Sequence, residues 1–436
     1  MAKRAPHRKK HRAATAPYHD ETGDTKIRCE RRRFLGQLGL SAMSAAIGST
    51  IVFGEYLPPG IIPIALAESP SPPALLGKDP RLTLLNDRPI NVETPAYLLD
   101  DDITPAGRLF VRNNGHPPAT SDSKSWTVRI DGESAQRSLT LKLDALKTRF
   151  SQVTETSVLE CAGNGRREFF PAAKGNQWST GAVGCVTWTG VRLRDVLKHV
   201  GIKSSAVYVA YEGADTHLSR DPNKKPISRG IPIQKALDDH CMLAWAMNGQ
   251  PIPPLHGAPL RLVAPGYPGS CAGKWVERLR IRDRVHDGPK MNGLAYRVPC
   301  EPVAPGTRVP NDKMCIIEAM PTKSLITFPR SGVQHRLPAP LRFRGHAWSG
   351  QATIESVEFS IDFGQSWHRA SVRHHQDRYA WHRWSGEVRL PKQGYYELWA
   401  RARDSSGRTQ PMILPGWNPK GYLNNACHRV AIQAIV

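Results

Sequence analysis

Residues 157–167 read Ser157-Val-Leu-Glu-Cys161-Ala-Gly-Asn-Gly-Arg166-Arg167, a β-type run that ends on a thiol and continues into a glycine-rich loop. Loops that follow strands are where α/β proteins hold ligands, and glycine lets the backbone pass close to a bulky group. The two arginines supply planar donors suited to an oxyanion, and nearby positive charge favours the thiolate form of a cysteine. The pattern predicts a ligand site at Cys161. A buried structural cysteine is the alternative.

The chain is strongly basic, with 60 Lys and Arg against 38 Asp and Glu in 436 residues, a formal net charge of +22. Such a charge suits anionic substrates, acidic partners or nucleic acid. Beyond the first dozen residues we find no long Lys/Arg tract, and there is no zinc-finger or ribonucleoprotein motif, so no nucleic-acid partner is expected. The length allows two or three domains, and 37 Pro and 36 Gly indicate many turns and short strands.

Residues 1–67 have the features of an exported leader. A polar, basic stretch expected to be disordered precedes Arg31-Arg-Arg-Phe-Leu35, which an apolar Gly/Ala/Ser-rich run follows to Phe53. Two arginines followed by Phe-Leu predict a twin-arginine signal, and Ala65-Leu-Ala67 predicts cleavage after Ala67 and a periplasmic mature protein. An uncleaved membrane anchor of about 19 residues is the alternative. Because this route exports folded proteins, commonly with a cofactor already inserted, a metal or organic cofactor is expected.

Cysteine usage leaves room for a free thiol. Of the eight cysteines, seven follow the predicted signal, an odd number, so at least one should be unpaired in a monomer. No Cys-x-x-Cys motif occurs, which argues against structural zinc, iron–sulfur clusters and covalently attached haem. Cys300 and Cys315 could pair, and the sequence leaves this open.

Hydrophobic patterning divides the rest of the chain at about residue 305. The region 68–304 is predicted to be an α+β domain. We expect its strands at 126–130, at the run ending on Cys161, and at 206–211, 242–247, 260–263 and 275–281, with helices at 141–150, 191–200 and 234–239. The region 305–436 shows alternating apolar and polar residues at 341–344, 355–361, 367–372, 386–390 and 395–402. This spacing predicts an all-β sandwich of immunoglobulin type without helices.

Other segments of the first region carry groups that could form a site. Arg112 lies among amides and an imidazole in residues 110–116, and residues 256–261 combine His256 with Arg261. The loop 266–275 is rich in small residues and ends near Lys274, a plausible cradle for a phosphate. Each is ordinary alone, but their occurrence together with Cys161 in one region favours a shared site.

The same segments belong to a longer ordered set of motifs. These are Phe110-Val-Arg-Asn113, Glu160-Cys-Ala-Gly-Asn-Gly-Arg166, Trp188-Thr-Gly-Val-Arg-Leu-Arg-Asp195, Ala246-Met-Asn-Gly249, His256-Gly-Ala-Pro-Leu-Arg261, Gly273-Lys-Trp275 and Trp417-Asn-Pro-Lys-Gly421. In this set the chain resembles the sulfite oxidase family of molybdenum enzymes, over nearly all of residues 80–436.

The resemblance implies one molybdenum–molybdopterin cofactor and no haem. The family's single protein thiolate on molybdenum corresponds to Cys161, in agreement with the preference of soft metals for sulfur. The residues expected to bind the cofactor are Asn113, Asn114, Cys161, Asp215, His256, Arg261, Ala272, Gly273 and Lys274.

The resemblance also implies a pocket for a small oxyanion. Its expected catalytic residues are Arg112, Arg166, Trp178, Tyr296 and Lys420. Two residues depart from the family pattern: Asn114 stands where the family often has histidine, and Lys420 stands where it has a substrate arginine. Lysine keeps the charge but loses bidentate geometry, so the identity of the oxyanion stays open.

The implied activity is oxidation of sulfite to sulfate by oxygen-atom transfer, with electrons passed to a soluble cytochrome c or cupredoxin. A homodimer formed through the C-terminal sandwich is expected, with a heteromer containing a cytochrome subunit as an alternative. Two other functions stay open: a sulfane-sulfur dehydrogenase subunit of a thiosulfate-oxidising complex, and a cofactor-free binding protein of the same fold.

Overall fold

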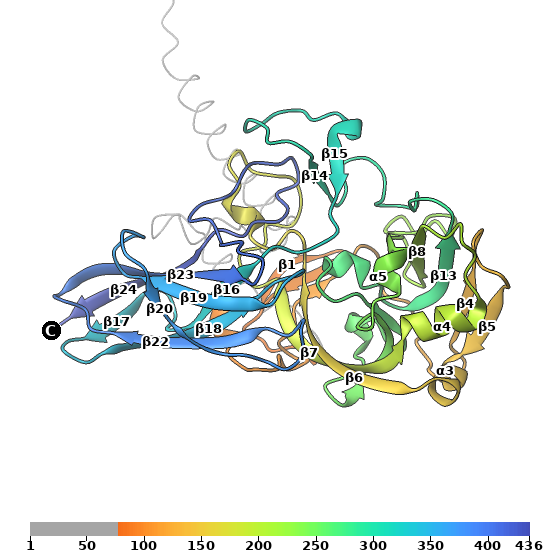
Figure 1. Ribbon diagram of the computed structural model, residues 1–436, viewed down its shortest axis with the longest axis horizontal. Helices are drawn as coiled ribbons and strands as arrows, with labels where there is room; N and C mark the ends of the chain where they lie inside the picture. The colour runs from red at the N-terminus through yellow and green to blue at the C-terminus, as the bar shows by residue number, and fades with distance from the viewer. Residues whose placement is uncertain (1–76) are drawn as a thin grey trace, which may run out of the picture. The chain divides into compact units, whose positions relative to one another are not determined.

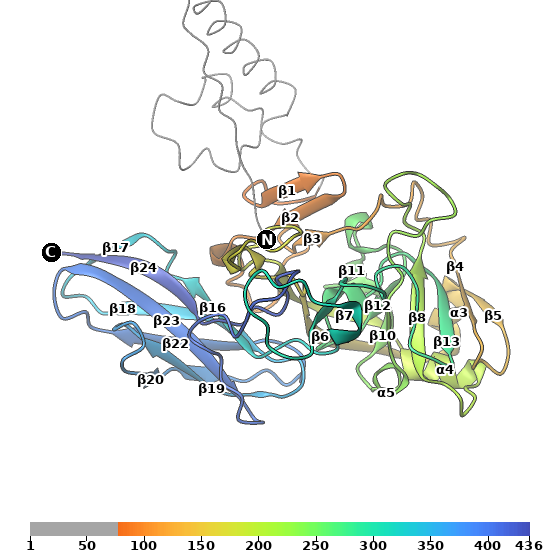
Figure 2. The same ribbon diagram turned by 90° about the horizontal axis from the view of Figure 1, so that it is seen from above.

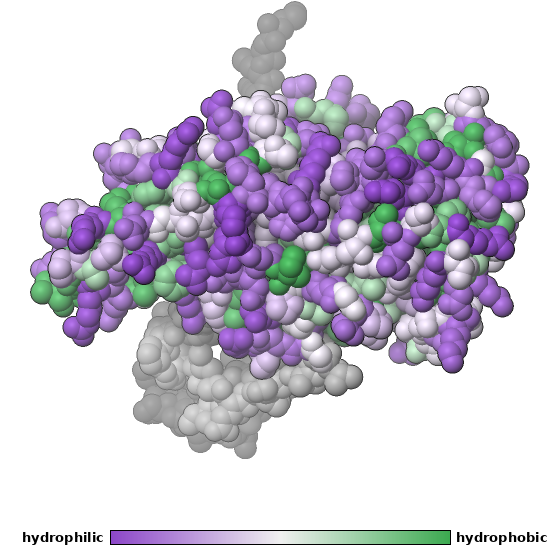
Figure 3. Space-filling model, turned by 60° about the horizontal axis from the view of Figure 1, so that its bottom comes forward, coloured by the Kyte–Doolittle hydropathy of each residue, from purple (hydrophilic) through white to green (hydrophobic). Residues whose placement is uncertain are grey.

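The computed structural model describes residues 77–436 (Figure 1). The predicted leader and export signal at 1–67 lie outside these residues. No helix within 77–436 is long and apolar enough to cross a membrane. The face seen in Figure 3 is largely hydrophilic, with hydrophobic residues scattered in small separate patches.

A small antiparallel sheet opens the described chain. It consists of β1 (Thr83–Asp87), β2 (Ile90–Glu93) and β3 (Val111–Arg112), in that order. The register pairs Asn91 with Arg112, and the Asn91 carboxamide oxygen accepts a hydrogen bond from the Asn113 backbone N–H at 2.9 Å. The sheet therefore fixes the start of the segment that carries three of the predicted site residues.

Two five-stranded sheets form the region up to residue 282. In the first, β6 (Gln152–Glu160), β7 (Val183–Arg192), β10 (Met242–Met247) and β11 (Gln250–Pro251) lie in the order β11-β10-β7-β6, and β12 (Arg261–Val263) pairs with β10. The second has the order β5-β4-β13-β8-β9, formed by β5 (Leu139–Lys142), β4 (Thr127–Asp131), β13 (Val276–Arg282), β8 (Tyr208–Gly213) and β9 (Gly230–Pro232). Its pairings are antiparallel except that of β4 with β13 (Figure 2).

Few helices accompany these sheets. They are α3 (Leu143–Arg149), α4 (Leu193–Val200) and α5 (Ile233–Ala236), with short 3₁₀ turns at Ala96–Leu98, Arg166–Glu168, Pro254–His256 and Gly269–Cys271. Helix α4 ends as predicted at Gly201, whose N–H bonds to the carbonyls of Leu197 and Lys198. It begins two residues later than expected because Val191 and Arg192 continue strand β7. The α+β prediction therefore overstates the helical content of a region that is mostly β.

The long β6–β7 pair positions the predicted thiol. Nine residues of β6 pair in register with β7, from Gln152 opposite Val191 to Glu160 opposite Val183. The pairing ends at Cys161, whose N–H donates to the Ala182 carbonyl at 2.9 Å. Cys161 is therefore held at the end of a strand, as the sequence predicts.

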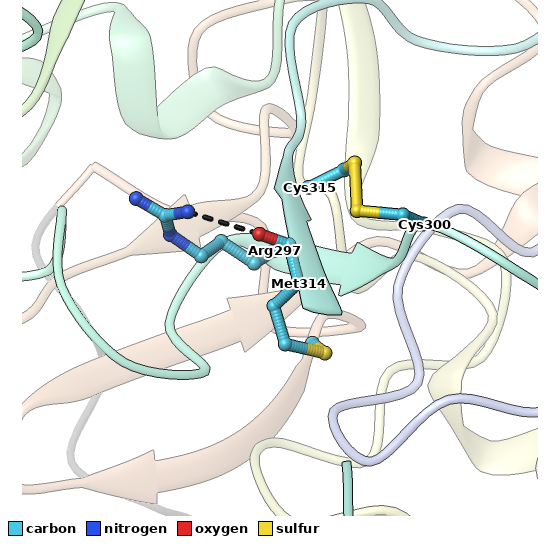
Figure 4. The surroundings of a disulfide bond; sticks show 4 residues. All are labelled: Arg297, Cys300, Met314 and Cys315. Atoms are coloured by element: carbon cyan, nitrogen blue, oxygen red, sulfur yellow. Dashed lines mark hydrogen bonds between the residues drawn. A yellow bond between two sulfur atoms is a disulfide. The ribbon is translucent and has the colours of Figure 1, made fainter. Parts of the chain in front are cut away.

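A disulfide-bonded hairpin connects the two regions. Strands β14 (Arg297–Pro299) and β15 (Met314–Ile316) pair antiparallel, and Cys300 is joined to Cys315 (Figure 4). The Arg297 guanidinium donates to the Met314 carbonyl at 3.0 Å across the hairpin. The pairing that the sequence left open is thus present, and Cys161 is among the cysteines that remain free.

Two facing sheets form the C-terminal region (Figure 1). One has the order β16-β18-β22-β21, formed by β16 (Lys323–Phe328), β18 (Leu341–Trp348), β22 (His382–Val388) and β21 (Ser371–Arg373). The other has the order β17-β24-β23-β19-β20, formed by β17 (Val333–Arg336), β24 (His428–Ile435), β23 (Gly394–Asp404), β19 (Ile354–Ser360) and β20 (His368–Arg369). Side chains from both sheets share one buried cluster that includes Phe343, Trp384, Phe359 and Leu398.

The all-β prediction for this region is confirmed, and the described residues there contain no α-helix, only a 3₁₀ turn at Asn311–Lys313. Strands β16, β17 and β24 were not predicted. The immunoglobulin type and the boundaries at 67 and 304 stay predictions.

A buried carboxylate joins the two regions beside Cys161. The Glu160 side chain, at the end of β6, accepts hydrogen bonds from Lys323 Nζ at 2.6 Å, Trp348 Nε1 at 2.9 Å and Asn164 Nδ2 at 3.0 Å. Lys323 begins β16 and Trp348 ends β18, while Glu160 is 2% and Lys323 6% exposed. The ion pair is therefore an internal contact between the sandwich and the strand that carries the thiol.

Replacing Lys323 with methionine should lower the free energy of unfolding by about 3–5 kcal/mol, because it leaves the buried Glu160 carboxylate without its counter-charge. Denaturant unfolding measures this change. Lys392→Met, at an exposed lysine of the same region, should change the free energy by less than about 0.5 kcal/mol. A loss from Lys323→Met no larger than that control would contradict the assignment, and adding Glu160→Gln should recover part of the loss.

Candidate functional site

Two cavities meet at Cys161. The first, which we call the His256 cavity, has a volume of about 650 Å³, and the second, the Lys420 cavity, about 630 Å³. Arg112, Asn114, Cys161 and Tyr296 line both cavities. A molecule in either cavity therefore faces the Cys161 side chain.

Most predicted site residues line these cavities although they are far apart in the sequence. Those on the His256 cavity are Arg112, Asn113, Asn114, Cys161, Asp215, His256, Arg261, Ala272, Lys274 and Tyr296. The Lys420 cavity adds Arg166 and Lys420, together with Lys174, Lys290 and Tyr422, which were not predicted.

Two predicted residues lie elsewhere. Trp178 lines neither cavity: it is fully buried beside them, and its ring meets that of Phe110 edge to face, with 6.2 Å between centroids. Phe110 lines the His256 cavity, so Trp178 packs against a residue of the cavity wall, and its assignment to the pocket stays a prediction. Gly273 is packed instead against Tyr211, whose ring would lie 2.4 Å from a Cβ at this position.

The loop after Cys161 leaves space for an arginine. The Asn164 N–H donates to the Cys161 carbonyl at 2.9 Å, and a Cβ at Gly163 would lie 2.3 Å from the Arg166 guanidinium. Arg166 donates from Nε to the Lys420 carbonyl at 2.6 Å and from Nη1 to the Asn176 carbonyl at 2.8 Å. Glycine at position 163 is thus what lets Arg166 fold back toward the thiol.

Cations gather at the inner wall of the His256 cavity. Lys274 Nζ donates to Asn113 Oδ1 and to the Leu255 carbonyl, both at 2.7 Å, and Arg261 Nη1 donates to the His256 carbonyl at 2.7 Å. Burial holds the pKa of Lys274 well below its usual value and lowers that of Arg261 to about 10. Burial and three neighbouring cations likewise hold the pKa of His256 far below its usual range, so its ring is neutral.

Acidic groups compensate little of this charge. Among the described residues that line the His256 cavity only Asp215 is acidic, and burial raises its pKa to about 6. Asn113 Nδ2 and Arg261 Nε are buried donors without a hydrogen-bond partner within residues 77–436. Unmatched buried donors and cations are costly unless a ligand satisfies them. The His256 cavity therefore suits an anion with several acceptor atoms.

The Lys420 cavity is positively charged as well. Arg112, Arg166, Lys174, Lys290 and Lys420 line it, and none of the described residues on its wall is acidic. Burial lowers the pKa of Lys420, and the neighbouring cations lower it further. Clefts lined with one sign of charge concentrate ions of the opposite sign. Because Cys161 also lines this cavity, a small anion bound in it would lie near the thiol.

A stack of four side chains borders the Lys420 cavity. Arg229 lies 4.8 Å from the Tyr296 ring centroid, Tyr296 stacks on Tyr422 at 5.6 Å and 13°, and Arg166 lies 5.1 Å from the Tyr422 centroid. The Tyr296 N–H also donates to the Tyr422 hydroxyl at 3.3 Å and Tyr296 has a φ of +52°, a conformation that non-glycine residues rarely adopt. The stack fixes Tyr296 and Arg166 relative to each other.

Sequence reasoning did not find Tyr422 and Arg229 as part of this arrangement. Tyr422 follows the quoted Trp417–Gly421 motif by one residue, and that adjacency is the one signal that could have pointed to it. Arg229 lies in a segment without any motif, and its role depends on contacts with residues distant in the chain.

Comparison with known proteins agrees with this geometry. Residues 114–290 match the family model described as an oxidoreductase molybdopterin binding domain, and residues 314–435 match a Mo-co oxidoreductase dimerisation domain. Together they define a molybdopterin oxidoreductase.

Individual relatives identify the family within this class. The chain is 32% identical to the sulfite oxidase of Gallus gallus over 366 residues, covering 81% of this chain and 78% of that protein. It is 31% identical to the mitochondrial sulfite oxidase of Rattus norvegicus over 373 residues, covering 82% of this chain. The chain belongs to the sulfite oxidase family. It spans 66% of the length of the rat enzyme and 62% of that of the Drosophila melanogaster enzyme.

A solved structure extends the likeness to the fold. The sulfane dehydrogenase SoxCD from Paracoccus pantotrophus matches with a TM-score of 0.66 and 30% sequence identity, covering 78% of this chain and 83% of that one. Both sulfite oxidases and a sulfane dehydrogenase are therefore similar to this chain at about the same level of identity.

The residues present fit a molybdopterin cofactor. The cations and unpartnered donors of the His256 cavity suit an anionic, acceptor-rich group such as a pterin phosphate. Cys161 lines the same cavity and supplies the soft sulfur ligand that molybdenum prefers. The donor set thus matches both ends of the cofactor.

The raised pKa of Asp215 predicts a pH-dependent stability in protein without bound cofactor. Because the folded-state pKa, about 6, exceeds the ordinary value of 3.8, the stabilising contribution is complete below pH 4 and is lost as the pH rises through 6. The wild type should lose about 2–3 kcal/mol relative to Asp215→Asn between pH 4 and pH 7. Denaturant unfolding across this range checks the difference, and parallel curves for the two proteins would refute it.

Proposed function

We propose that the protein is a periplasmic, molybdenum-dependent sulfite dehydrogenase that oxidises sulfite to sulfate and passes electrons to an external one-electron carrier. The observation that carries the proposal is the position of Cys161, where a cavity suited to the cofactor meets a second, cationic cavity. Family membership supports the reaction class, and the rat and chicken sulfite oxidases align with 82% and 81% of this chain.

The cofactor would be held by the residues of the His256 cavity. Cys161 would be the protein ligand to molybdenum, while His256, Arg261 and Lys274 would bind the pterin and its phosphate, with Asn113, Asn114, Asp215 and Ala272 around them. When bound, the group supplies two-electron redox chemistry and oxygen-atom transfer.

The chain's own residues would bind and orient the anion. Arg112, Arg166 and Lys420 place fixed positive charge around the Lys420 cavity and would hold sulfite beside Cys161. Tyr296 borders both cavities, and its phenolic oxygen would donate or accept a proton during the reaction. The stacked Tyr422 would keep that phenol in place.

Location and assembly extend the proposal. The predicted twin-arginine signal supports export to the periplasm, where a soluble cytochrome c or cupredoxin would accept the electrons. The match to a dimerisation domain at 314–435 supports a homodimer. The likeness to SoxCD supports a heteromer as the alternative, in which we propose a cytochrome as the second subunit. Cell fractionation and light scattering of the purified protein check these points.

A sulfane dehydrogenase activity is the second candidate. The solved structure of SoxCD is 30% identical to this chain, close to the identity of the sulfite oxidases. Lys420 also gives the anion pocket a single-point charge in place of the planar fork of an arginine. Without the two parallel hydrogen bonds of an arginine, the pocket recognises a small oxyanion less specifically. This favours a different sulfur substrate as the second candidate.

The test is sulfite-dependent reduction of cytochrome c by the purified, cofactor-loaded protein. We expect turnover in the wild type and a loss of at least about a thousandfold in Cys161→Ser, because the thiolate is the proposed ligand. Cys427→Ser, at a buried free cysteine outside both cavities, is the matched control and should keep its activity.

The outcome also separates the two candidates. If the cofactor-containing wild type does not oxidise sulfite but oxidises protein-bound sulfane sulfur, the second function is correct and the first is not. If sulfite is the substrate, Lys420→Met should raise KM about tenfold or more through loss of a charge-assisted contact, and Lys420→Arg should restore most of it. An unchanged KM in Lys420→Met would remove Lys420 from the substrate site.

A further inference from the structure

Lys78 contacts the His256 side chain, and the sequence analysis did not predict it as a site residue. It stands in the short segment before β1, outside the residues 114–290 that match the molybdopterin-binding model. Its Nζ lies 2.5 Å from His256 Nε2 and donates to the carbonyls of Ala106 and Leu109, both at 2.7 Å. A chain segment about 180 positions away thus contacts a residue of the proposed cofactor cavity.

The three contacts of Lys78 match the three N–H groups of an ammonium. Two go to carbonyl oxygens, which accept only, so the third is directed at His256 Nε2. An anion in the cavity favours this charged form of lysine, because burial alone lowers the pKa of Lys78 to about 7 and a nearby negative charge opposes that effect. With the anion bound, His256 Nε2 is therefore an acceptor and the ring proton lies on Nδ1.

The segment around His256 collects three cations. Lys78 contacts the His256 ring, Arg261 donates to the His256 carbonyl at 2.7 Å, and Lys274 donates to the adjacent Leu255 carbonyl at 2.7 Å. His256 is only 1% exposed and belongs to a single 3₁₀ turn, Pro254–His256. A short turn of this kind has little structure of its own, so these side chains determine where the ring lies.

We propose that Lys78 is a positioning residue of the cofactor site: it fixes His256 as the neutral tautomer that offers Nδ1–H to the cofactor. This inference rests on the proposed function, which places molybdopterin in the His256 cavity. It extends the site to an N-terminal segment that precedes every motif of the resemblance.

The first experiment compares Lys78→Met with Lys203→Met in protein purified with its cofactor. Lys203 also donates to a backbone carbonyl, that of Glu133 at 3.1 Å, but is exposed, so it is the matched control. Lys78→Met should release molybdenum and pterin about tenfold faster on mild heating, and Lys203→Met should release them at the wild-type rate. Equal rates for Lys78→Met and the wild type would overturn the proposal.

The second experiment separates cofactor binding from a merely structural role. Wild type and Lys78→Met are also purified from cells that cannot make molybdopterin, and the gain in melting temperature on cofactor binding is measured for each. If Lys78 had only a structural role, Lys78→Met would lower the melting temperatures of the cofactor-free and cofactor-bound protein equally. The gain in melting temperature on cofactor binding would then equal that of the wild type, which would contradict the proposal. We expect a smaller gain in Lys78→Met, because the lysine stabilises the bound form preferentially.

A double-mutant cycle tests whether Lys78 acts through His256. If it does, the release rate of Lys78→Met/His256→Ala should be close to that of His256→Ala alone. Independent, multiplicative effects would overturn the link between the two residues. A wild type that carries neither molybdenum nor pterin would instead refute the proposed function, and so the two failures are distinguishable.

Discussion

The Glu160 carboxylate is the contact on which the arrangement of the site depends. It closes strand β6, precedes Cys161, and accepts hydrogen bonds from Lys323 and Trp348 of the sandwich as well as from Asn164 of the following loop. Burying an ion pair is costly, and removing one partner is costlier still. The interaction therefore holds the two regions together beside the thiol. Lys420 and Tyr422, from the C-terminal region, line the Lys420 cavity together with Cys161.

The buried charges of the site destabilise the protein when no cofactor is bound. Lys274 and Arg261 are buried beside the neutral His256 ring, and Asp215 is an incomplete counter-charge because burial raises its pKa to about 6. Burying positive charge without a counter-charge costs free energy, so we expect a bound anion to compensate this cluster. Binding of a phosphate-bearing cofactor in the His256 cavity would supply that negative charge. The Lys420 cavity is also lined by cations and would bind a smaller anion near Cys161.

Local sequence patterns predicted those parts of the structure that depend on local physics. The amphipathic run that ends at Gly201 is helix α4, and the alternating residues after 340 are strands of the sandwich. The position of Cys161 at a strand end followed from the β-type run and the glycines. Side chains that belong to motifs, such as Arg112 and Lys274, were also found, and they do converge on one cavity.

What the sequence could not provide are contacts made across the fold. Lys78 has no motif and reaches His256 only through tertiary structure, and Tyr422 matters because its ring stacks on Tyr296. The contact of the Trp178 ring with Phe110, a residue of the His256 cavity, is likewise made by tertiary structure. The sequence allowed a disulfide between Cys300 and Cys315 but left it open, because pairing depends on how close the fold brings the two residues.

The central claim is that Cys161 binds molybdenum at the meeting point of the two cavities. X-ray absorption at the molybdenum edge of the purified protein tests it most directly, with wild type and Cys161→Ser measured side by side. The account predicts one fewer sulfur neighbour around molybdenum in the variant than in the wild type. An equal number of sulfur neighbours in the two proteins would contradict it.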